Sequence, residues 1–319
     1  VDRIMSGVLT AAQPIVVRAE TSESDLIRPV EKMLIHARGC TAVKLVRKAK
    51  EYGLNVVLVQ SDPDMESVAA DMVRDEEGHS LVCIGGNTSD ESYLNALSVL
   101  SIGEAQGVDS LHPGIGFLSE DPNFARIVRQ RGVNFIGPKV DSMETMGNKS
   151  NAINTTISID VPVVPGSHGI VENAERAAEI SENIGYPVLL KAVHGGGGKG
   201  IQVVERPEQV HGLFHQVTTE AKNAFGNGDV YIEKFVTSLR HIEVQVLRDT
   251  QGNTRVLGLR DCSVQRNNQK LMEESSSTML PEKLKKSVFG YAEQIANAVD
   301  YHGAGTVEFI YDVPSDAVY

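Results

Sequence analysis

Cysteine is scarce in this sequence, and none of its apolar runs is long. The 319 residues include only 3 cysteines, Cys40, Cys83 and Cys262, which are odd in number and far apart. Because no two of them have a C-x-x-C spacing, we expect neither a disulfide framework nor a zinc site, and a reducing cytoplasm or organelle matrix suits the chain. No apolar run approaches the roughly 20 residues of a membrane-spanning helix, and the N-terminus lacks a secretory pattern. Membrane insertion is therefore not expected.

Basic residues are in the minority. The chain has 30 Lys and Arg against 42 Asp and Glu, which gives a formal net charge of -12 at pH 7. Such a charge repels nucleic acid and anionic lipid, so we expect neither as a partner. With 41% hydrophobic and 23% charged residues, the chain can bury a sizeable core, and its length suggests two or three domains.

Apolar runs alternate with helical patterns in the first part of the chain. Residues 32–39 predict a short buried strand that enters a glycine turn, residues 40–53 a helix, and residues 54–62 the next strand. Strand and helix patterns continue in turn to about Pro138. This alternation predicts an α/β fold that starts with a doubly wound, Rossmann-like parallel sheet. Residues 1–30 lack a clear period and are expected to form an irregular leader.

The pattern changes after Pro138 to strand pairs with helices between them. Residues 161–166 predict a strand, and residues 305–312 predict the last strand of the chain. Residues 240–265 alternate on both sides of a Gln-Gly-Asn turn, which predicts a hairpin. A second domain of different architecture is therefore expected.

Four consecutive glycines, Gly195 to Gly198, precede Lys199 and Gly200 and lie between two apolar runs. A dinucleotide fingerprint needs a helix after the loop, but the residues after Gly200 have the pattern of a strand. A Walker A loop needs Ser or Thr after its Gly-Lys pair, and Gly200 stands there. Two interpretations remain: a hairpin tip whose backbone N–H groups hold an anion beside Lys191 and Lys199, or a flexible tip without a ligand.

Three further polar features allow both a functional and a plain structural interpretation. Glu233 and Lys234 end a strand pattern, where such residues usually form a solvated edge. The stretch from Arg260 to Lys270 is rich in polar side chains, which suits a site or a surface loop. Glu308 alternates with apolar neighbours, so its carboxylate should face away from them, either into solvent or into a cleft where it could bind Mg²⁺.

Taken in order, these segments resemble the biotin carboxylase component of the biotin-dependent carboxylases, within the ATP-grasp superfamily. The resemblance runs from about Glu31 to Tyr319, and its motifs include "FIGP", "MGNKSNA", "KAVHGGGGKGIQVV", "VYIEKFV", "RHIEVQVL", "RDCSVQRNNQK" and "GAGTVEFIY". It implies a biotin carboxylase N-terminal domain at residues 31–136. It also implies an ATP-grasp domain at residues 137–319, incomplete at its C-terminus, with a mobile flap at about residues 163–235.

The resemblance also implies roles for individual residues. Lys270 would bind bicarbonate, and Glu308 would be the first of two carboxylates that hold Mg²⁺ or Mn²⁺. The nucleotide would be contacted by a larger set, namely Lys149, Lys191, Gly197, Gly198, Glu233, Lys234, Phe235, Val236, His241, Gln265, Asn268 and Glu308. Within this set the two lysines at 149 and 191 would meet phosphates, residues 233–236 would hold adenine, and Gln265 would lie beside the ribose.

The implied reaction is the ATP-dependent carboxylation of biotin. ATP phosphorylates bicarbonate to carboxyphosphate, and lysines, backbone N–H groups and metal ions meet the charge on the transferring phosphoryl group. The carboxyl group then passes to biotin on a carrier domain, and a carboxyltransferase domain or subunit selects the acceptor in an acyl-CoA, pyruvate or urea-type carboxylase. Arg47 and Glu51 match positions at a homodimer interface, although an ordinary solvated ion pair has the same spacing.

Several positions depart from the family pattern. The sequence ends before the Glu-Met-Asn-x-Arg motif that carries the second metal ligand, the catalytic arginine and the glutamate base, so we expect the sequence by itself to be inactive. Ala37, Cys40, Ile115, His194 and Asn268 replace an asparagine, a glutamate, a tyrosine, a glycine and a histidine. Two alternatives therefore stay open: an inactive ATP-binding or scaffold module of a larger carboxylase, and another ATP-grasp ligase such as carbamoyl phosphate synthetase.

Overall fold

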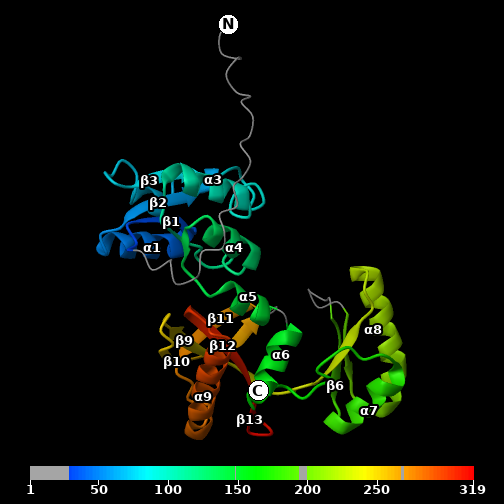
Figure 1. The fold of residues 1–319 in the computed structure, drawn as a ribbon. Coiled ribbons are helices and arrows are strands. Elements are labelled where there is room, and N and C mark those ends of the chain that lie inside the picture. The colour runs from blue at the N-terminus through cyan, green and yellow to red at the C-terminus, as the bar shows by residue number, and fades with distance from the viewer. Residues whose placement is uncertain (1–28, 148, 194–199, 267–268) are drawn as a thin grey trace, which may run out of the picture. The chain divides into compact units, whose positions relative to one another are not determined.

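The chain divides into two compact units, Val1–Ile136 and Gly137–Tyr319, which are described separately below (Figure 1). The computed structural model describes residues 29–319 apart from 148, 194–199 and 267–268. None of the helices within these described residues is long and apolar enough to cross a membrane.

The first unit is built on a parallel sheet of five strands, in the order β3-β2-β1-β4-β5. The strands are β1 (Lys32–His36), β2 (Asn55–Gln60), β3 (Ser80–Cys83), β4 (Ser110–His112) and β5 (Asn134–Phe135). The helices are α1 (Gly39–Glu51), η2 (Asp62–Asp64), α2 (Val68–Asp71), α3 (Ala96–Gln106) and α4 (Pro122–Gln130). All neighbouring strands pair in parallel, and Figure 1 shows α1 and α3 on opposite sides of the sheet. The predicted doubly wound parallel sheet is therefore confirmed.

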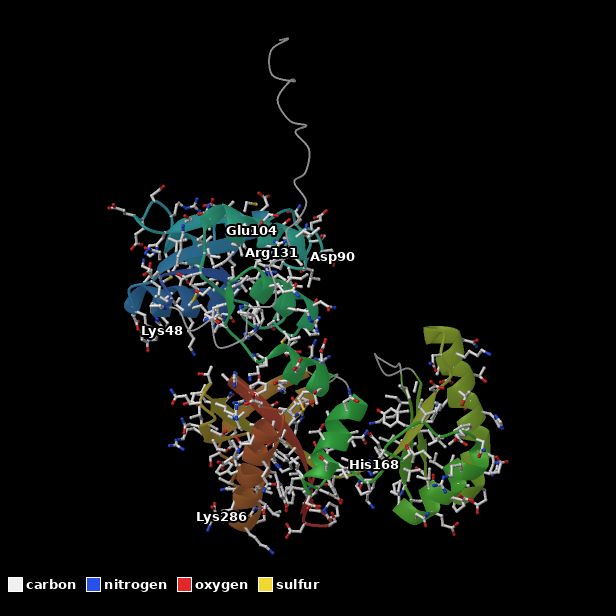
Figure 2. The ribbon with its side chains drawn as sticks, viewed as in Figure 1. Lys48, Asp90, Glu104, Arg131, His168 and Lys286 are labelled. Carbon is white, nitrogen blue, oxygen red and sulfur yellow. The ribbon has the colours of Figure 1, made fainter. Side chains whose placement is uncertain are left out.

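Local residues explain how these helices begin and how they are joined. Asp121 accepts the N–H groups of Asn123 and Phe124 at 2.8 and 3.0 Å, so it caps α4. Glu104 of α3 and Arg131, directly after α4, form an ion pair of 2.9 Å (Figure 2).

The sequence pattern did not predict β4, because three residues are too few to show a period.

The second unit contains an antiparallel sheet in the order β11-β10-β9-β12-β13. Its strands are β9 (Leu239–Arg248), β10 (Thr254–Arg266), β11 (Gln269–Ser275), β12 (Gly303–Asp312) and β13 (Ala317–Val318). The helix α9 (Glu282–Ala298) covers it, and Ile242, Val244, Val288 and Ala292 are fully buried in the shared core. The predicted hairpin is confirmed. The prediction that residues 305–312 form the last strand is wrong, because β13 folds back on β12.

A separate three-stranded sheet in the order β7-β6-β8 belongs to the same unit. It consists of β6 (Val188–Ala192), β7 (Ile201–Val204) and β8 (Val230–Lys234), and it packs on α7 (Ala174–Ile184) and α8 (Val210–Phe225). The remaining helices are α5 (Val140–Gly147), α6 (Lys149–Ser158) and η3 (Pro207–Gln209). β6 and β7 pair in antiparallel fashion and Ala192 donates its N–H to the Gly200 carbonyl at 2.8 Å, so the residues after the glycine run form the predicted strand, while the run itself, Gly195 to Gly198, lies outside the described residues.

Residues 161–166 do not form the predicted strand. Pro162 and Pro165 have no N–H group to donate, and the segment makes only an isolated bridge between Gly166 and Glu233. The segment still lies alongside β8, since the Pro165 carbonyl accepts the N–H of Lys234 at 2.8 Å. A Cβ atom on Gly166 would lie 2.6 Å from the Ile232 carbonyl oxygen, so this close approach requires glycine.

Candidate functional site

Four strands of the antiparallel five-stranded sheet in the second unit bring charged side chains together. Glu243 of β9 lies opposite Arg260 of β10 on one side and opposite Glu308 of β12 on the other. Side chains of directly paired residues share a face of the sheet, so these three point the same way. Lys270 of β11 joins them across β10. The pairing of β9 with β10 and β12 therefore collects residues that are far apart in the sequence, such as Glu243 and Glu308.

Glu243 lies at the centre of this cluster. Its side chain is 3% exposed, one carboxylate oxygen is 2.9 Å from Arg260 Nη2, and the other accepts a hydrogen bond from Lys270 Nζ. Burial raises the pKa of Glu243, but the hydrogen bonds from Lys270 and Arg260 outweigh it and hold that pKa below its usual value. Glu243 is therefore a charged carboxylate with two cationic partners.

His241 and Glu308 face the same point. His241 Nε2 lies 3.4 Å from a carboxylate oxygen of Glu243 and 3.5 Å from one of Glu308. Lys270 Nζ is also 3.5 Å from Glu308, whose side chain is 59% exposed. Ligand atoms from His241, Glu243 and Glu308 lie within 4.8 Å of one another, a spacing that suits ligands of one divalent cation. Glu308 points away from its apolar neighbours, as its alternation with them predicted.

The amide of Gln265 determines which nitrogen of His241 carries the proton. Gln265 Nε2 donates to the Cys262 carbonyl at 2.8 Å and lies 3.1 Å from His241 Nδ1. An amide nitrogen is only a donor, so Nδ1 is the acceptor and the hydrogen of the neutral ring is on Nε2. Nε2–H can donate to an anion but cannot ligate a metal ion. The two carboxylates of Glu243 and Glu308 are thus the metal ligands that this arrangement offers.

A second pair of predicted site residues meets in the three-stranded sheet. Lys191 Nζ of β6 donates a hydrogen bond to a carboxylate oxygen of Glu233 on β8. Their side chains are 26% and 23% exposed, so both charges are mostly buried and compensate one another. After β8, the N–H of Phe235 donates to the Pro187 carbonyl at 3.0 Å, which holds the chain beside this pair.

The other predicted site residues are placed only in part. Lys234 ends β8 and is half-buried, and Val236 is buried. Lys149 begins α6, but its side chain lies outside the described residues. Gly197, Gly198 and Asn268 also lie outside the described residues.

Sequence reasoning did not assign Glu243 or Arg260 to the site. Glu243 could have been found, because it is two residues from His241 and alternate residues of a strand share a face. Arg260 was noted only as the start of a polar stretch, because its place opposite Glu243 depends on the register between β9 and β10. The interpretation of residues 260–270 as a surface loop is wrong for the described residues, which belong to β10 and β11.

Two family models match the chain in succession. The model described as "Biotin carboxylase, N-terminal domain" matches residues 29–143. The model described as "Carbamoyl-phosphate synthase L chain, ATP binding domain" matches residues 148–319, more than half of the chain. This chain belongs to the biotin carboxylase family. The second unit, with its two antiparallel sheets, is accordingly an ATP-grasp fold, as the resemblance implied.

Relatives of this biotin carboxylase family member match most of the chain. Biotin carboxylase 1 of Bacillus subtilis (strain 168) is 44% identical over 290 residues, which are 91% of this chain and 63% of the relative. The propionyl-CoA carboxylase alpha chain of Ruegeria pomeroyi is 41% identical over 281 residues, 88% of this chain and 40% of that protein. The chain therefore spans less than two thirds of the length of these relatives.

Solved structures of biotin carboxylases have the same fold. A biotin carboxylase–beta-gamma-ATP complex from Campylobacter jejuni matches with a TM-score of 0.80 and 40% identity, over 93% of this chain and 65% of that one. The biotin carboxylase domain dimer of 2-oxoglutarate carboxylase from Hydrogenobacter thermophilus, in complex with MgADP, ADP and bicarbonate, matches with a TM-score of 0.78 and 37% identity, over 92% and 63%.

Proposed function

We propose that this chain is the ATP-binding part of a biotin carboxylase, a ligase that uses ATP, Mg²⁺ or Mn²⁺ and bicarbonate to carboxylate biotin through carboxyphosphate. The observation that carries the proposal is the cluster in which the Glu243 and Glu308 carboxylates, the Lys270 ammonium and the His241 Nε2–H face one point. Two carboxylates suit a divalent cation, and two donors suit the oxygen atoms of phosphate and bicarbonate.

Lys270 is the residue that we propose binds bicarbonate. The hydrogen bond with Glu243 raises the pKa of Lys270, so the ammonium group stays charged at neutral pH. Its side chain is 32% exposed, which leaves it accessible to a ligand while Glu243 holds its position. A positioned cation of this kind also stabilises the negative charge on a transferring phosphoryl group.

Metal binding is proposed at Glu308, with Glu243 beside it. A bound Mg²⁺ or Mn²⁺ would supply charge neutralisation at the phosphate oxygens. His241, held as the Nε2–H form by Gln265, would donate to an oxygen atom of the nucleotide rather than bind the metal. Gln265 itself is proposed to lie beside the ribose.

The three-stranded sheet is proposed to hold the rest of the nucleotide. Glu233 would accept the adenine amino group, and Lys191, freed from its ion pair, would turn to the phosphates. The resemblance supports the same nucleotide contact for the remaining residues, Lys149, Gly197, Gly198, Lys234, Phe235, Val236 and Asn268. In this proposal residues 31–136 are the N-terminal domain and residues 137–319 the ATP-grasp domain, with a flap at about residues 163–235 that closes over the phosphates and excludes water.

The partners proposed are a biotin carboxyl carrier domain and a carboxyltransferase domain or subunit. Relatives of this chain are parts of larger biotin-dependent carboxylases, such as the propionyl-CoA carboxylase alpha chain. A homodimer is supported by the domain dimer of the Hydrogenobacter relative. The three cysteines are free thiols, two of them exposed, which supports the cytoplasm or an organelle matrix as the compartment.

The test is bicarbonate-dependent ATP hydrolysis by the full-length protein with free biotin and Mg²⁺. We expect hydrolysis to require bicarbonate and to be lost when the metal is chelated. ATP binding without bicarbonate-dependent hydrolysis would instead support an inactive ATP-binding module. Hydrolysis that depends on ammonia or glutamine would support a ligase of the carbamoyl phosphate synthetase type.

A further inference from the structure

The strand beside His241 is irregular. The pairing of β10 with β9 runs from Thr254↔Arg248 to Asp261↔Ile242, one residue short of His241. On its other side, β10 shifts its register against β11 between Asp261 and Gln265. Such shifts mark a β-bulge, which redirects side chains and interrupts the ladder of backbone hydrogen bonds. On the side of β10, the main chain of His241 therefore lies beyond the paired register, although His241 is still paired with Ile310 of β12 on the other side.

The side chain of Ser263 is the partner of the His241 main chain on the side of β10. The N–H of His241 donates to Ser263 Oγ at 3.0 Å, and Ser263 Oγ donates its own hydrogen to Asp261 Oδ1. A hydroxyl has one hydrogen and a carboxylate only accepts, so the direction of both hydrogen bonds follows. On the side of β10, a side chain thus takes the place of a backbone partner at His241, the residue that faces Glu243 and Glu308.

Asp261 is held firmly in this position. Its side chain is 3% exposed, Arg240 Nε and Ser277 Oγ donate to Oδ2 at 2.7 and 2.9 Å, and the N–H of Ser263 donates to Oδ1 at 3.1 Å. Burial raises the pKa of Asp261, but the hydrogen bonds from Arg240, Ser263 and Ser277 outweigh it and lower that pKa. A buried, charged carboxylate with four donors is a rigid anchor.

We infer that Asp261 and Ser263 are positioning residues, which fix the main chain of His241 and thereby aim its imidazole at the nucleotide. The inference rests on the proposed nucleotide binding of this site. Neither residue needs to contact the nucleotide, because Ser263 acts through the His241 N–H. Gln265, from the same bulge, fixes the other end of His241 by holding Nδ1.

The chain contains a closely matched control for this role. Ser277 is fully buried, its hydroxyl accepts the N–H of Met279 at 3.3 Å, and it donates to the second oxygen of Asp261. Ser263 and Ser277 therefore make the same two kinds of hydrogen bond. They differ in the residue whose N–H they hold, which is His241 for the first and Met279 for the second.

The experiment compares Ser263→Ala, Ser263→Thr and Ser277→Ala in the full-length protein, with the ATP dissociation constant measured by calorimetric titration and the Tm by scanning calorimetry. We expect Ser263→Ala to raise the ATP dissociation constant by about tenfold, the equivalent of one lost hydrogen bond, and Ser263→Thr to restore it because the hydroxyl remains. Ser277→Ala should lower the Tm to a similar extent while the dissociation constant stays within about twofold. Equal effects of the two alanine variants on ATP affinity would overturn the inference.

A double-mutant cycle with His241→Ala separates positioning from general loosening of the fold. If Ser263 acts through His241, Ser263→Ala should have little further effect on ATP affinity once the imidazole is gone. Additive losses would overturn the inference. Wild-type protein that binds no ATP would refute the proposed function and the inference with it, whereas wild-type binding that Ser263→Ala leaves unchanged would refute the inference alone.

Discussion

Glu243 shows how much one buried carboxylate organises at the scale of the residue. Its negative charge compensates the charges of Arg260 and Lys270. It lies opposite Glu308 on the neighbouring strand β12 and is almost fully removed from solvent. Such a group keeps the cations in place only while it is charged, and the removal of one partner from a buried ion pair leaves the others uncompensated. Both stability and ligand binding should therefore depend on it.

We predict that Glu243→Gln lowers the free energy of unfolding by about 1–3 kcal/mol and bicarbonate-dependent ATP hydrolysis by at least about tenfold. The physical reason is that Lys270 loses the carboxylate that positions it. The measurements are chemical denaturation and steady-state hydrolysis by the full-length protein. Glu273→Gln is the control, since Glu273 also lies near Arg260, at 3.6 Å, but is half exposed and should change either quantity little. A Glu243→Gln variant that hydrolyses ATP at the wild-type rate would contradict the role of Glu243.

His36 makes the stability of the first unit depend on pH. Burial lowers the pKa of His36 from 6.5 to about 4, and its Nε2 lies 2.9 Å from the Tyr93 carbonyl oxygen. Below pH 6.5 the unfolded chain binds a proton at this residue that the folded chain does not bind until about pH 4, so stability falls as the pH falls through this range. The loss should approach about 3 kcal/mol.

The measurement is the free energy of unfolding between pH 7 and pH 4 for the wild type and for His36→Gln. The glutamine keeps a hydrogen-bond donor but does not titrate, so its curve should be flatter between pH 6.5 and pH 4. Parallel curves for the two proteins would show that His36 does not carry the dependence.

At the scale of the element, β8 depends on the segment beside it. The turn at Gly166 brings the chain against β8 at Glu233, and this contact leaves no room for a Cβ atom. Gly169, three residues later, has its nearest neighbour at 4.0 Å and can accept a side chain. The two glycines therefore differ in what they permit, although the sequence alone does not distinguish them.

We predict that Gly166→Ala lowers the free energy of unfolding by about 1–3 kcal/mol, because the added methyl group forces the segment away from β8. ATP affinity should fall as well, since Glu233 lies at the contact. Gly169→Ala should leave both quantities near their wild-type values. Calorimetry and ATP titration measure them, and equal effects of the two substitutions would contradict the steric argument.

At the scale of the whole molecule, the two units have separate cores. Leu58 is fully buried in the core of the first unit, and Ile242 is fully buried between the five-stranded sheet and α9 of the second. Units with their own cores can unfold in separate transitions, which departs from two-state behaviour.

We predict two thermal transitions, each sensitive to one of these side chains. Leu58→Ala should destabilise one transition by about 2–5 kcal/mol and Ile242→Ala the other by a similar amount, since each leaves a cavity in one core. Differential scanning calorimetry separates the two. A single transition that both variants shift equally would show that the units unfold together.

Much of the fold could be predicted because its signals are local. The strand and helix alternation that begins at Lys32 indicated the parallel sheet, and the alternation around residues 240–265 indicated the hairpin. The failures are equally local: β4 is too short to show a period, and residues 161–166 have strand-like composition but lack two N–H groups at their prolines. For the proposed site, the sequence named candidate residues only within the family motifs, and their roles stay predictions.

The sequence by itself determined the parallel sheet of the first unit and the hairpin of residues 240–265, and it named Lys270 and Glu308 as candidate ligand-binding residues. Only the tertiary structure decided that Glu243 becomes the buried partner of Arg260 and Lys270, and that Ser263 holds the main chain of His241. The reason is that these contacts depend on strand register and on a bulge, and a shift of one residue would send the same side chains to the opposite face.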